Sequence, residues 1–207
     1  MLFFEMFSAR RRDGIEVSLS SPVRQGVDKP WLNLIRGDHE GIRLPIIFQQ
    51  VEGRIYSDLI ETKHAGLFLI SERMVEILSE EKLTGWGQFP ISLLDSANQQ
   101  IFGYAGLSIL GRCGPIDLSR SEIISKAVFP GAPITRYFRG KHINPDEWDG
   151  NDFFLPEGYY GAFISEKAAK VLKSRKLSNI ELKNLAEIEV PEETARMLDR
   201  LKSFRPR

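Results

Sequence analysis

The sequence predicts an α+β protein built on a mixed or antiparallel sheet, with few helices and with two related β-α-β units. Short apolar runs bounded by glycine, proline and asparagine recur along the chain, which is typical of strands and turns. Helical spacing of apolar residues is confined to a few segments. These segments do not alternate regularly with the strands, which disfavours a doubly wound fold.

The length and charge of the chain limit its organisation and its partners. We expect residues 1–207 to form a single domain, in which residues 1–55 are a candidate N-terminal β-rich subdomain. Lys plus Arg and Asp plus Glu each number 28, so the formal net charge is zero. Nucleic-acid binding usually requires a basic surplus and is therefore not expected. Weak repulsion between copies makes a homodimer a reasonable expectation.

Cysteine content and the N-terminus indicate a cytoplasmic protein. The single cysteine, Cys113, cannot form an intrachain disulfide, which fits a reducing compartment. The apolar run at residues 2–7 is short, contains Glu5 and precedes its arginines, unlike a secretory signal. We predict that it forms the first strand. Because no apolar run is long enough to span a bilayer, contact with a membrane is not expected.

Two further strands are predicted before residue 55. The runs Trp31–Ile35 and Ile42–Val51 are rich in apolar residues and are flanked by glycine-containing turns. Pro45 lacks a backbone N–H, so it marks an edge strand or a bulge in the second run.

An internal echo relates residues 58–84 to residues 152–178 at a constant offset. Its clearest part is Ile70–Arg73, which aligns with Ile164–Lys167. In each copy a strand leads to a serine placed to cap a helix, and a glutamate follows it. The helices are expected to end near Leu83 and Leu177, before glycine or asparagine and a further strand. A duplicated unit explains this pattern; coincidence between two common strand–cap–helix units is the alternative.

The remaining segments are mostly predicted strands. Ile101–Leu110 contains two glycines, which indicate a bend or a close backbone approach. Glu122–Val128 and Ile134–Phe138 flank a turn at residues 130–133. A last helix is predicted to begin near Pro191, where two glutamates follow.

Gly111–Asp117 is the densest unusual segment, and two interpretations of it compete. Cys113 could act as a nucleophile whose pKa Arg112 lowers, but it would need a base. The three histidines, His39, His64 and His142, have no known spacing to it. Alternatively, the segment is a structural turn in which Arg112 and Asp117 pair or bond to the backbone. The structural interpretation is favoured.

Metal and cofactor sites are not predicted. Asp149 and Asp152 lie in an acidic loop, but the residue order of a calcium-binding loop is not met. Scattered histidines and one cysteine give no zinc pattern, and phosphate- and dinucleotide-binding motifs are missing from the sequence. Trp86 and Trp148 each lie among glycines. Tryptophan is a frequent interface anchor, yet packing in the core is the favoured interpretation here.

Three segments together resemble a known family. They are Leu83–Trp86 followed by Phe89–Leu94, then Gly106–Asp117, and finally Trp148–Pro156. In this combination the chain resembles bacterial immunity proteins of polymorphic toxin systems, a family typified by a myxobacterial member. The resemblance runs from about residue 30 to residue 190.

The resemblance implies a cytosolic protein that binds and neutralises a cognate toxin, without a cofactor. The motif residues that it singles out, either structural or binding, are Trp86, Arg112, Cys113, Asp117, Trp148, Asp149 and Asp152. Two other functions stay open. One is an enzyme that uses a polar cleft near Arg112, Cys113 and Asp117. The other is a small-ligand-binding protein or structural homodimer, in which the duplicated unit frames a cleft at its pseudo-twofold axis.

Overall fold

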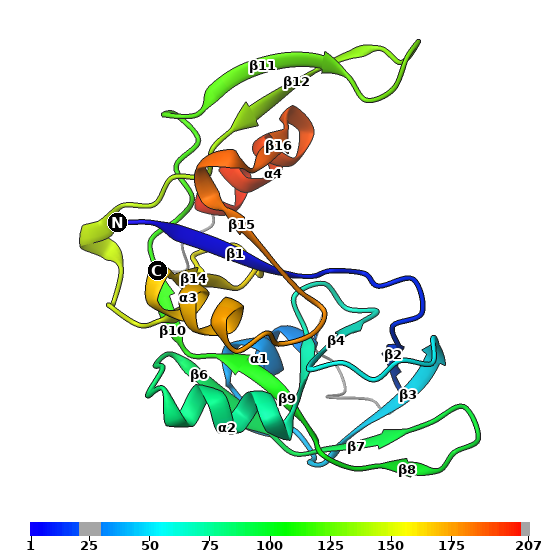
Figure 1. The fold of residues 1–207 in the computed structure, drawn as a ribbon. Helices are drawn as coiled ribbons and strands as arrows, with labels where there is room; N and C mark the ends of the chain where they lie inside the picture. Colours follow the sequence, from blue (N-terminus) through cyan, green and yellow to red (C-terminus); the bar gives the residue numbers. More distant parts are fainter. Residues whose placement is uncertain (21–29, 204–207) are drawn as a thin grey trace.

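A computed structural model describes residues 1–20 and 30–203 of the protein, and these residues form an α+β fold dominated by strands (Figure 1). One sheet has the order β10 (Gly111–Cys113), β13 (Phe153–Pro156), β14 (Phe163–Ser165), β1 (Phe3–Ser8) and β15 (Ile180–Asn184). A longer sheet has the order β6 (Trp86–Phe89), β9 (Tyr104–Ile109), β5 (Phe68–Ser71), β4 (Leu59–Thr62), β2 (Glu16–Leu19), β3 (Ile46–Glu52), β7 (Ile91–Leu94) and β8 (Gln100–Ile101). A small sheet contains β11 (Glu122–Ala127), β12 (Ile134–Arg139) and β16 (Glu189–Pro191).

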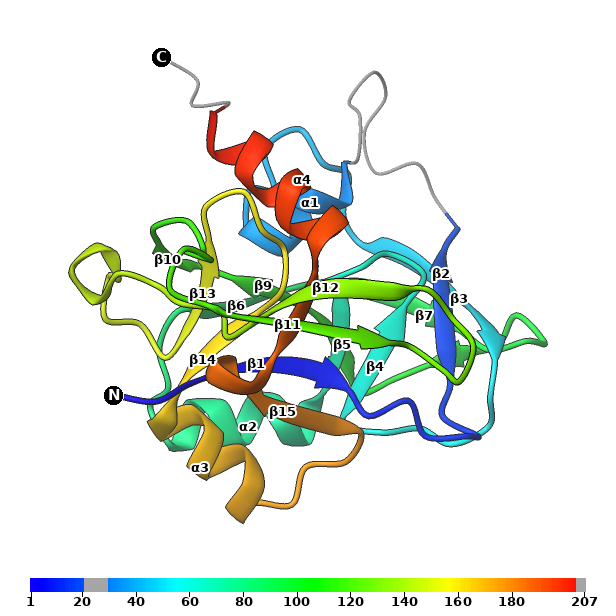
Figure 2. The same ribbon diagram turned by 90° about the horizontal axis from the view of Figure 1, so that it is seen from above.

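The helices are α1 (Trp31–Arg36), α2 (Glu72–Glu80), α3 (Glu166–Ser174) and α4 (Glu192–Ser203), with two short 3-10 turns at Pro145–Glu147 and Leu185–Glu187. Helices α2 and α3 lie side by side in both views (Figures 1 and 2). Their apolar stripes pack into a large core that also receives side chains from both long sheets. A smaller core lies around β14, α4 and the start of β1.

The two long sheets contain copies of one five-stranded unit. The order β2-β4-β5-β9-β6 in one sheet corresponds to β10-β13-β14-β1-β15 in the other. The registers of the paired strands correspond as well. Three pairs in the eight-stranded sheet are Ser71–Tyr104, Trp86–Ile109 and Glu61–Glu16. In the same order, their equivalents in the five-stranded sheet are Ser165–Phe3, Ile180–Ser8 and Leu155–Arg112. The duplication is therefore much longer than the echo visible in the sequence.

The two repeats exchange their first strands. The first repeat begins at β1, but β1 lies between β14 and β15 of the second repeat. The second repeat begins at β9, which lies between β5 and β6 of the first. Strands β1 and β2, both within residues 1–55, consequently lie in different sheets. Because each sheet takes an interior strand from the other repeat, neither repeat has a complete sheet of its own.

Asp58, just before β4, ties the two repeats together. Its carboxylate accepts hydrogen bonds from the Ser71 hydroxyl at 2.8 Å and from the Ser178 backbone N–H and hydroxyl at 2.7 Å each. Arg73 adds an ion pair at 2.9 Å. Ser71 belongs to the first repeat and caps α2, whereas Ser178 follows α3 in the second.

Asp152 makes the equivalent bonds in the opposite direction. It accepts from the Ser165 hydroxyl at 2.7 Å, from the Thr84 backbone N–H at 3.1 Å and from Lys167 at 3.1 Å. Ser165 caps α3, and Thr84 follows α2. Each aspartate thus joins the helix cap of its own repeat to the loop after the helix of the other.

The helix boundaries correct one prediction. Ser71 and Ser165 are the N-caps, as predicted, since their hydroxyls accept from backbone N–H groups at 3.1 and 3.2 Å. The helices end at Glu80 and Ser174, before the predicted positions near residues 83 and 177. The reason is that the residues at 82 and 176 are lysines with φ of 49° and 51°, a left-handed conformation that stops an α-helix.

The predicted strand Trp31–Ile35 is wrong, because this segment forms helix α1. Trp31, Leu34 and Ile35 have the spacing of one helix face, and Leu34 and Ile35 are buried. Gly37 ends the helix in the left-handed region, with φ of 78°. The run is too short for its spacing to separate a helix from a buried strand.

The other predicted strands form with small changes at their ends. The run from residue 42 becomes a strand only at Ile46, after Pro45. The predicted strand Ile101–Leu110 bends at Gly103, which has φ of 81° and separates β8 from β9. The strand predicted after the second helix of the echo forms as β15 and is followed by a 3-10 turn.

The hydrogen-bond networks of Asp58 and Asp152 make the free energy of unfolding decrease at low pH. Burial alone would raise the pKa of Asp58 and Asp152, but the hydrogen bonds and the cations beside them outweigh it and hold both pKa values below the ordinary 3.8. The unfolded chain therefore binds protons at these two carboxylates more readily than the folded chain does. The stabilisation that the ionised carboxylates give to the fold is complete above pH 3.8 and is lost as the pH falls through the folded pKa values. We expect a double Asp58→Asn, Asp152→Asn variant to show a shallower loss of unfolding free energy in this acid range, measured by urea denaturation. An unchanged slope would contradict this assignment.

Candidate functional site

The segments Gly111–Asp117 and Trp148–Pro156, which carry most of the motif residues, pack against each other. Gly111–Cys113 forms strand β10, a correction to the turn predicted there, because it pairs in parallel with β13. The Arg112 backbone N–H donates to the Asp149 carboxylate at 2.6 Å, and the Asp149 N–H donates back to the Arg112 carbonyl at 3.1 Å. Asp149 therefore occupies the open edge of β10. A side chain at Gly111 would meet the Phe153 carbonyl at 2.3 Å, so glycine permits this close packing.

The remaining motif side chains also point to structural contacts. The Arg112 guanidinium donates to the backbone carbonyls of Ile109 at 2.6 Å and Arg36 at 2.9 Å. Asp117 accepts from the Ser119 backbone N–H at 2.9 Å. These bonds match the structural interpretation of this segment.

The tryptophans belong to the scaffold as well. The Trp86 indole donates to the Leu83 carbonyl at 2.8 Å and its ring packs on the large core. The Trp148 indole donates to the Asn151 carbonyl at 3.0 Å, and its ring meets Phe3 edge-on with a centroid distance of 5.0 Å. Both side chains therefore stabilise the fold through packing and a hydrogen bond to the backbone.

Cys113 lacks the environment of a nucleophile. It is 6% exposed, and burial together with the charges of Asp149 and Glu147 raises its pKa to about 12. Thiolates, not thiols, are the reactive form. We therefore expect alkylation of Cys113 by iodoacetamide at pH 8 to be at least about a hundredfold slower in the native protein than in urea. Comparable rates, followed by mass spectrometry, would revive the thiol-enzyme hypothesis.

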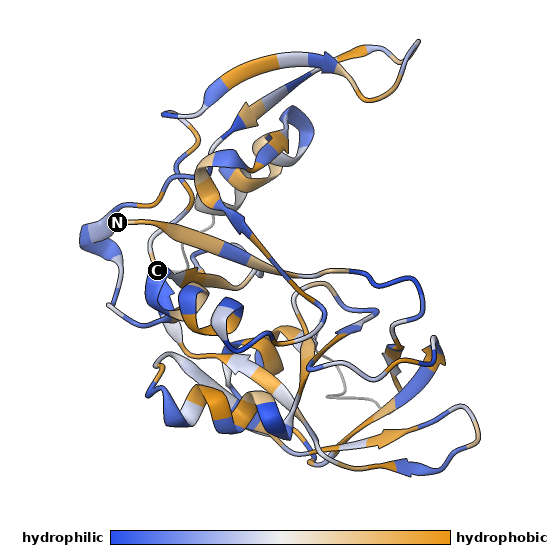
Figure 3. Cartoon of the chain, viewed as in Figure 1, coloured by the Kyte–Doolittle hydropathy of each residue, from blue (hydrophilic) through white to orange (hydrophobic). Residues whose placement is uncertain are grey.

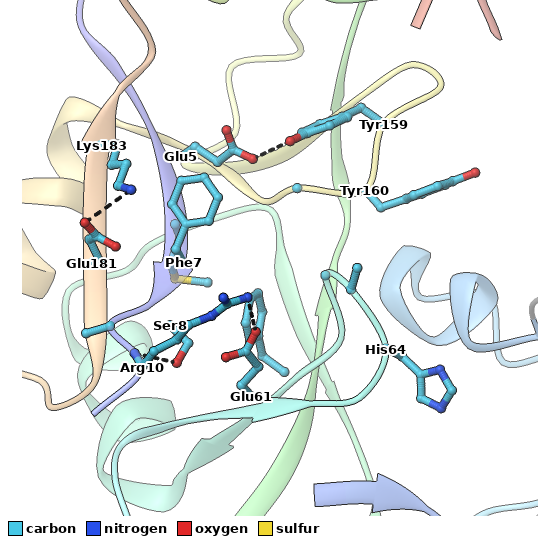
Figure 4. A pocket seen from close by; sticks show the side chains of 16 residues that line it. Glu5, Phe7, Ser8, Arg10, Glu61, His64, Tyr159, Tyr160, Glu181 and Lys183 are labelled. Carbon is cyan, nitrogen blue, oxygen red and sulfur yellow. Dashed lines mark hydrogen bonds and ion pairs between the residues drawn. The ribbon is translucent and has the colours of Figure 1, made fainter. Parts of the chain in front are cut away.

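A cavity of about 460 Å³ lies where the two repeats meet. The β4–β5 turn and the equivalent β13–β14 turn both line it, together with β1 and β15 (Figure 4). Its exposed charges pair with one another: Arg10 lies 3.4 Å from Glu61, and Lys183 lies 3.4 Å from Glu181. A ligand-binding function would require a cleft between the repeats, and this cavity is lined by residues of both. Its paired charges do not select a class of ligand.

A buried polar cluster forms part of the wall of this cavity, since Glu5 and Tyr159 both line it. The Lys141 ammonium donates to Glu5 at 2.5 Å and to the Tyr159 hydroxyl at 2.7 Å, and that hydroxyl donates to Glu5 at 2.7 Å. Lys141 is 6% exposed and Glu5 only 1%. Burial lowers the pKa of Lys141, although Glu5 opposes this effect. Burial also raises the pKa of Tyr159, and Glu5 adds to the shift. Each of the three groups has its partners within the cluster.

The β11–β12 hairpin differs from the rest of the molecule in exposure. It lies at the top of Figure 1, beyond α4 and β1, and Figure 3 shows apolar residues along β11 and in the turn. The exposed fractions are 55% for Ile123, 68% for Val128, 65% for Phe129 and 76% for Ile134. Exposed apolar residues in such a group are typical of a surface that another molecule covers.

The two faces of the hairpin carry different side chains. Phe138 on β12 packs on the small core, and Ile123 lies opposite it on the same face. The outer face carries ion pairs: Arg139 contacts Glu122 at 3.1 Å and Glu189 at 3.2 Å, and Lys126 also pairs with Glu189. Both strands could be predicted from the sequence, but the exposure of their apolar side chains could not.

The described residues contain no cluster of three or more metal-ligating side chains. Within the same part of the chain, the helices are too short or too polar to cross a bilayer. Neither a protein-family model nor a curated protein matches the sequence.

Proposed function

We propose that this chain is a cytoplasmic immunity protein that neutralises a bacterial toxin by binding it through the β11–β12 hairpin. The observation that supports this best is the group of four large apolar side chains exposed on one projecting element. The family resemblance supplies the toxin as the partner. An occluding complex of this kind would bury on the order of 1,600 Å² in total.

The duplication indicates which part of the molecule carries specificity. Elements common to both repeats form the five-stranded unit of each long sheet and the aspartate network. Among the described residues of the first repeat, which leave out 21–29, no hairpin corresponds to it, and the elements after β2 are α1 and β3. A partner-specific surface is expected in an element that the common scaffold does not require. On this proposal, the motif residues stabilise the common fold through burial or through bonds to the backbone and do not contact the toxin.

The hairpin turn offers a direct test with a matched control. Phe129→Ser removes an apolar side chain that is 65% exposed, and Phe102→Ser removes one that is 80% exposed on the β8–β9 turn. We expect Phe129→Ser to weaken binding of the toxin domain encoded beside this gene by about tenfold or more, and to reduce protection of cells producing it. Phe102→Ser should leave both unchanged. Equal effects of the two variants, or no binding by the wild-type protein, would contradict the proposal.

A further inference from the structure

The outer edge of β11 is open. Strand β11 ends the small sheet, with β12 on its other side. In the described part of the chain, no backbone hydrogen bond joins this edge to another segment. Five of its six residues are exposed. An edge strand of this kind presents unpaired N–H and C=O groups to any extended segment that fits it.

The sequence of β11 is complementary to itself when read in the antiparallel direction. In a symmetric pair centred on Ile124, Glu122 of each copy lies opposite Lys126 of the other. Pairs centred on Ile123 or Ser125 are also allowed by the alternation of backbone groups. The first places Glu122 opposite Ile124 and Lys126 opposite Arg120, a like charge, and the second places both charges opposite isoleucine or valine. The centre at Ile124 therefore has the best charge match.

We infer that two copies of this chain associate through their β11 strands in this register. The three strands of each copy then form one continuous sheet about a twofold axis, with identical contacts on both sides. Glu122 is 63% and Lys126 is 47% exposed, so both can contact a second copy while keeping their present partners. The exposed Ile123 of both copies comes to the same face, which buries apolar surface as well.

A second edge strand, β15, also alternates Glu181 and Lys183. Its apolar residues Ile180 and Leu182 already pack on the large core. Pairing there would bury little additional apolar surface, whereas Ile123 on β11 is largely exposed. This difference favours β11. Of the four exposed apolar side chains assigned to toxin binding, the dimer covers Ile123 alone, because it places the two hairpin turns at opposite ends of the joined sheet.

Complementary charge variants test the register directly. The dimer contains two contacts between residue 122 of one copy and residue 126 of the other. Either Glu122→Lys or Lys126→Glu places like charges at both contacts, so we expect each variant to weaken self-association by at least about tenfold. An equimolar mixture of the two variants restores opposite charges at both contacts and should form a heterodimer. Analytical ultracentrifugation at micromolar concentration measures all three samples, and thermal unfolding verifies that each variant is folded.

Glu181→Lys on β15 is the matched control and should leave the wild-type dimer unchanged. Three results would each overturn the inference: a monomeric wild-type protein at high micromolar concentration, a mixture of the charge variants that stays monomeric, or a dimer weakened by Glu181→Lys and not by Glu122→Lys.

Discussion

Replacing Lys141 with methionine should lower the free energy of unfolding by about 3–5 kcal/mol, because it leaves the buried Glu5 carboxylate without its cation. Tyr159 alone cannot neutralise a carboxylate that is 1% exposed. Urea denaturation of the variant and the wild-type protein measures the difference. The effect is expected to be large because β1, the exchanged strand, carries Glu5.

A double variant and an exposed pair separate this charge effect from simple loss of packing. Glu5→Gln combined with Lys141→Met removes both charges and should recover much of the lost stability. Lys170→Met removes a cation from the exposed Glu166–Lys170 pair and should cost no more than about 0.5 kcal/mol. If the double variant were less stable than Lys141→Met alone, the cluster would not be a coupled ion pair.

Asp152→Ala should lower the free energy of unfolding by about 2–4 kcal/mol, since it leaves the Ser165, Thr84 and Lys167 donors without their acceptor. Asp58→Ala should have a similar effect, because its bonds are the equivalent ones. Chemical denaturation monitored by tryptophan fluorescence and by circular dichroism checks both variants.

Cooperativity provides the second readout for the aspartate variants. Each aspartate joins the two repeats, so both probes should still report one shared transition at the lower denaturant concentration. Two separate transitions would show that the repeats unfold independently, which strand exchange does not allow. A loss below about 0.5 kcal/mol in either variant would contradict the role given to these carboxylates.

The echo was readable in the sequence because it contains the residues of the aspartate network. Asp58 and Asp152, Ser71 and Ser165, and Thr84 and Ser178 fill equivalent places in one hydrogen-bond pattern that tolerates few side chains. Strands β1 and β9 share no identical residue in register, since many apolar residues can fill a buried strand position. The fold class and the capped helices could therefore be predicted, but strand exchange could not.

The sites that sequence analysis missed depend on contacts between distant segments. Glu5, Lys141 and Tyr159 meet only because β1 lies in the sheet of the second repeat. Nothing local to any of them marks a buried cluster. Conversely, the conspicuous glycines and aspartates around Arg112 and Trp148 indicated a special local geometry, which is the contact between β10 and the loop at residues 149–152. Clustered glycines and aspartates thus indicated a place where the backbone packs closely and side chains bond to it.

Hydrogen exchange of the chain mixed with its proposed toxin partner tests the central claim most directly. The account predicts that new amide protection is concentrated in residues 122–139, the β11–β12 hairpin, with little change in the rest of the described chain. Protection confined instead to the β4–β5 and β13–β14 turns around the cavity would contradict it, and would place binding at the junction of the repeats.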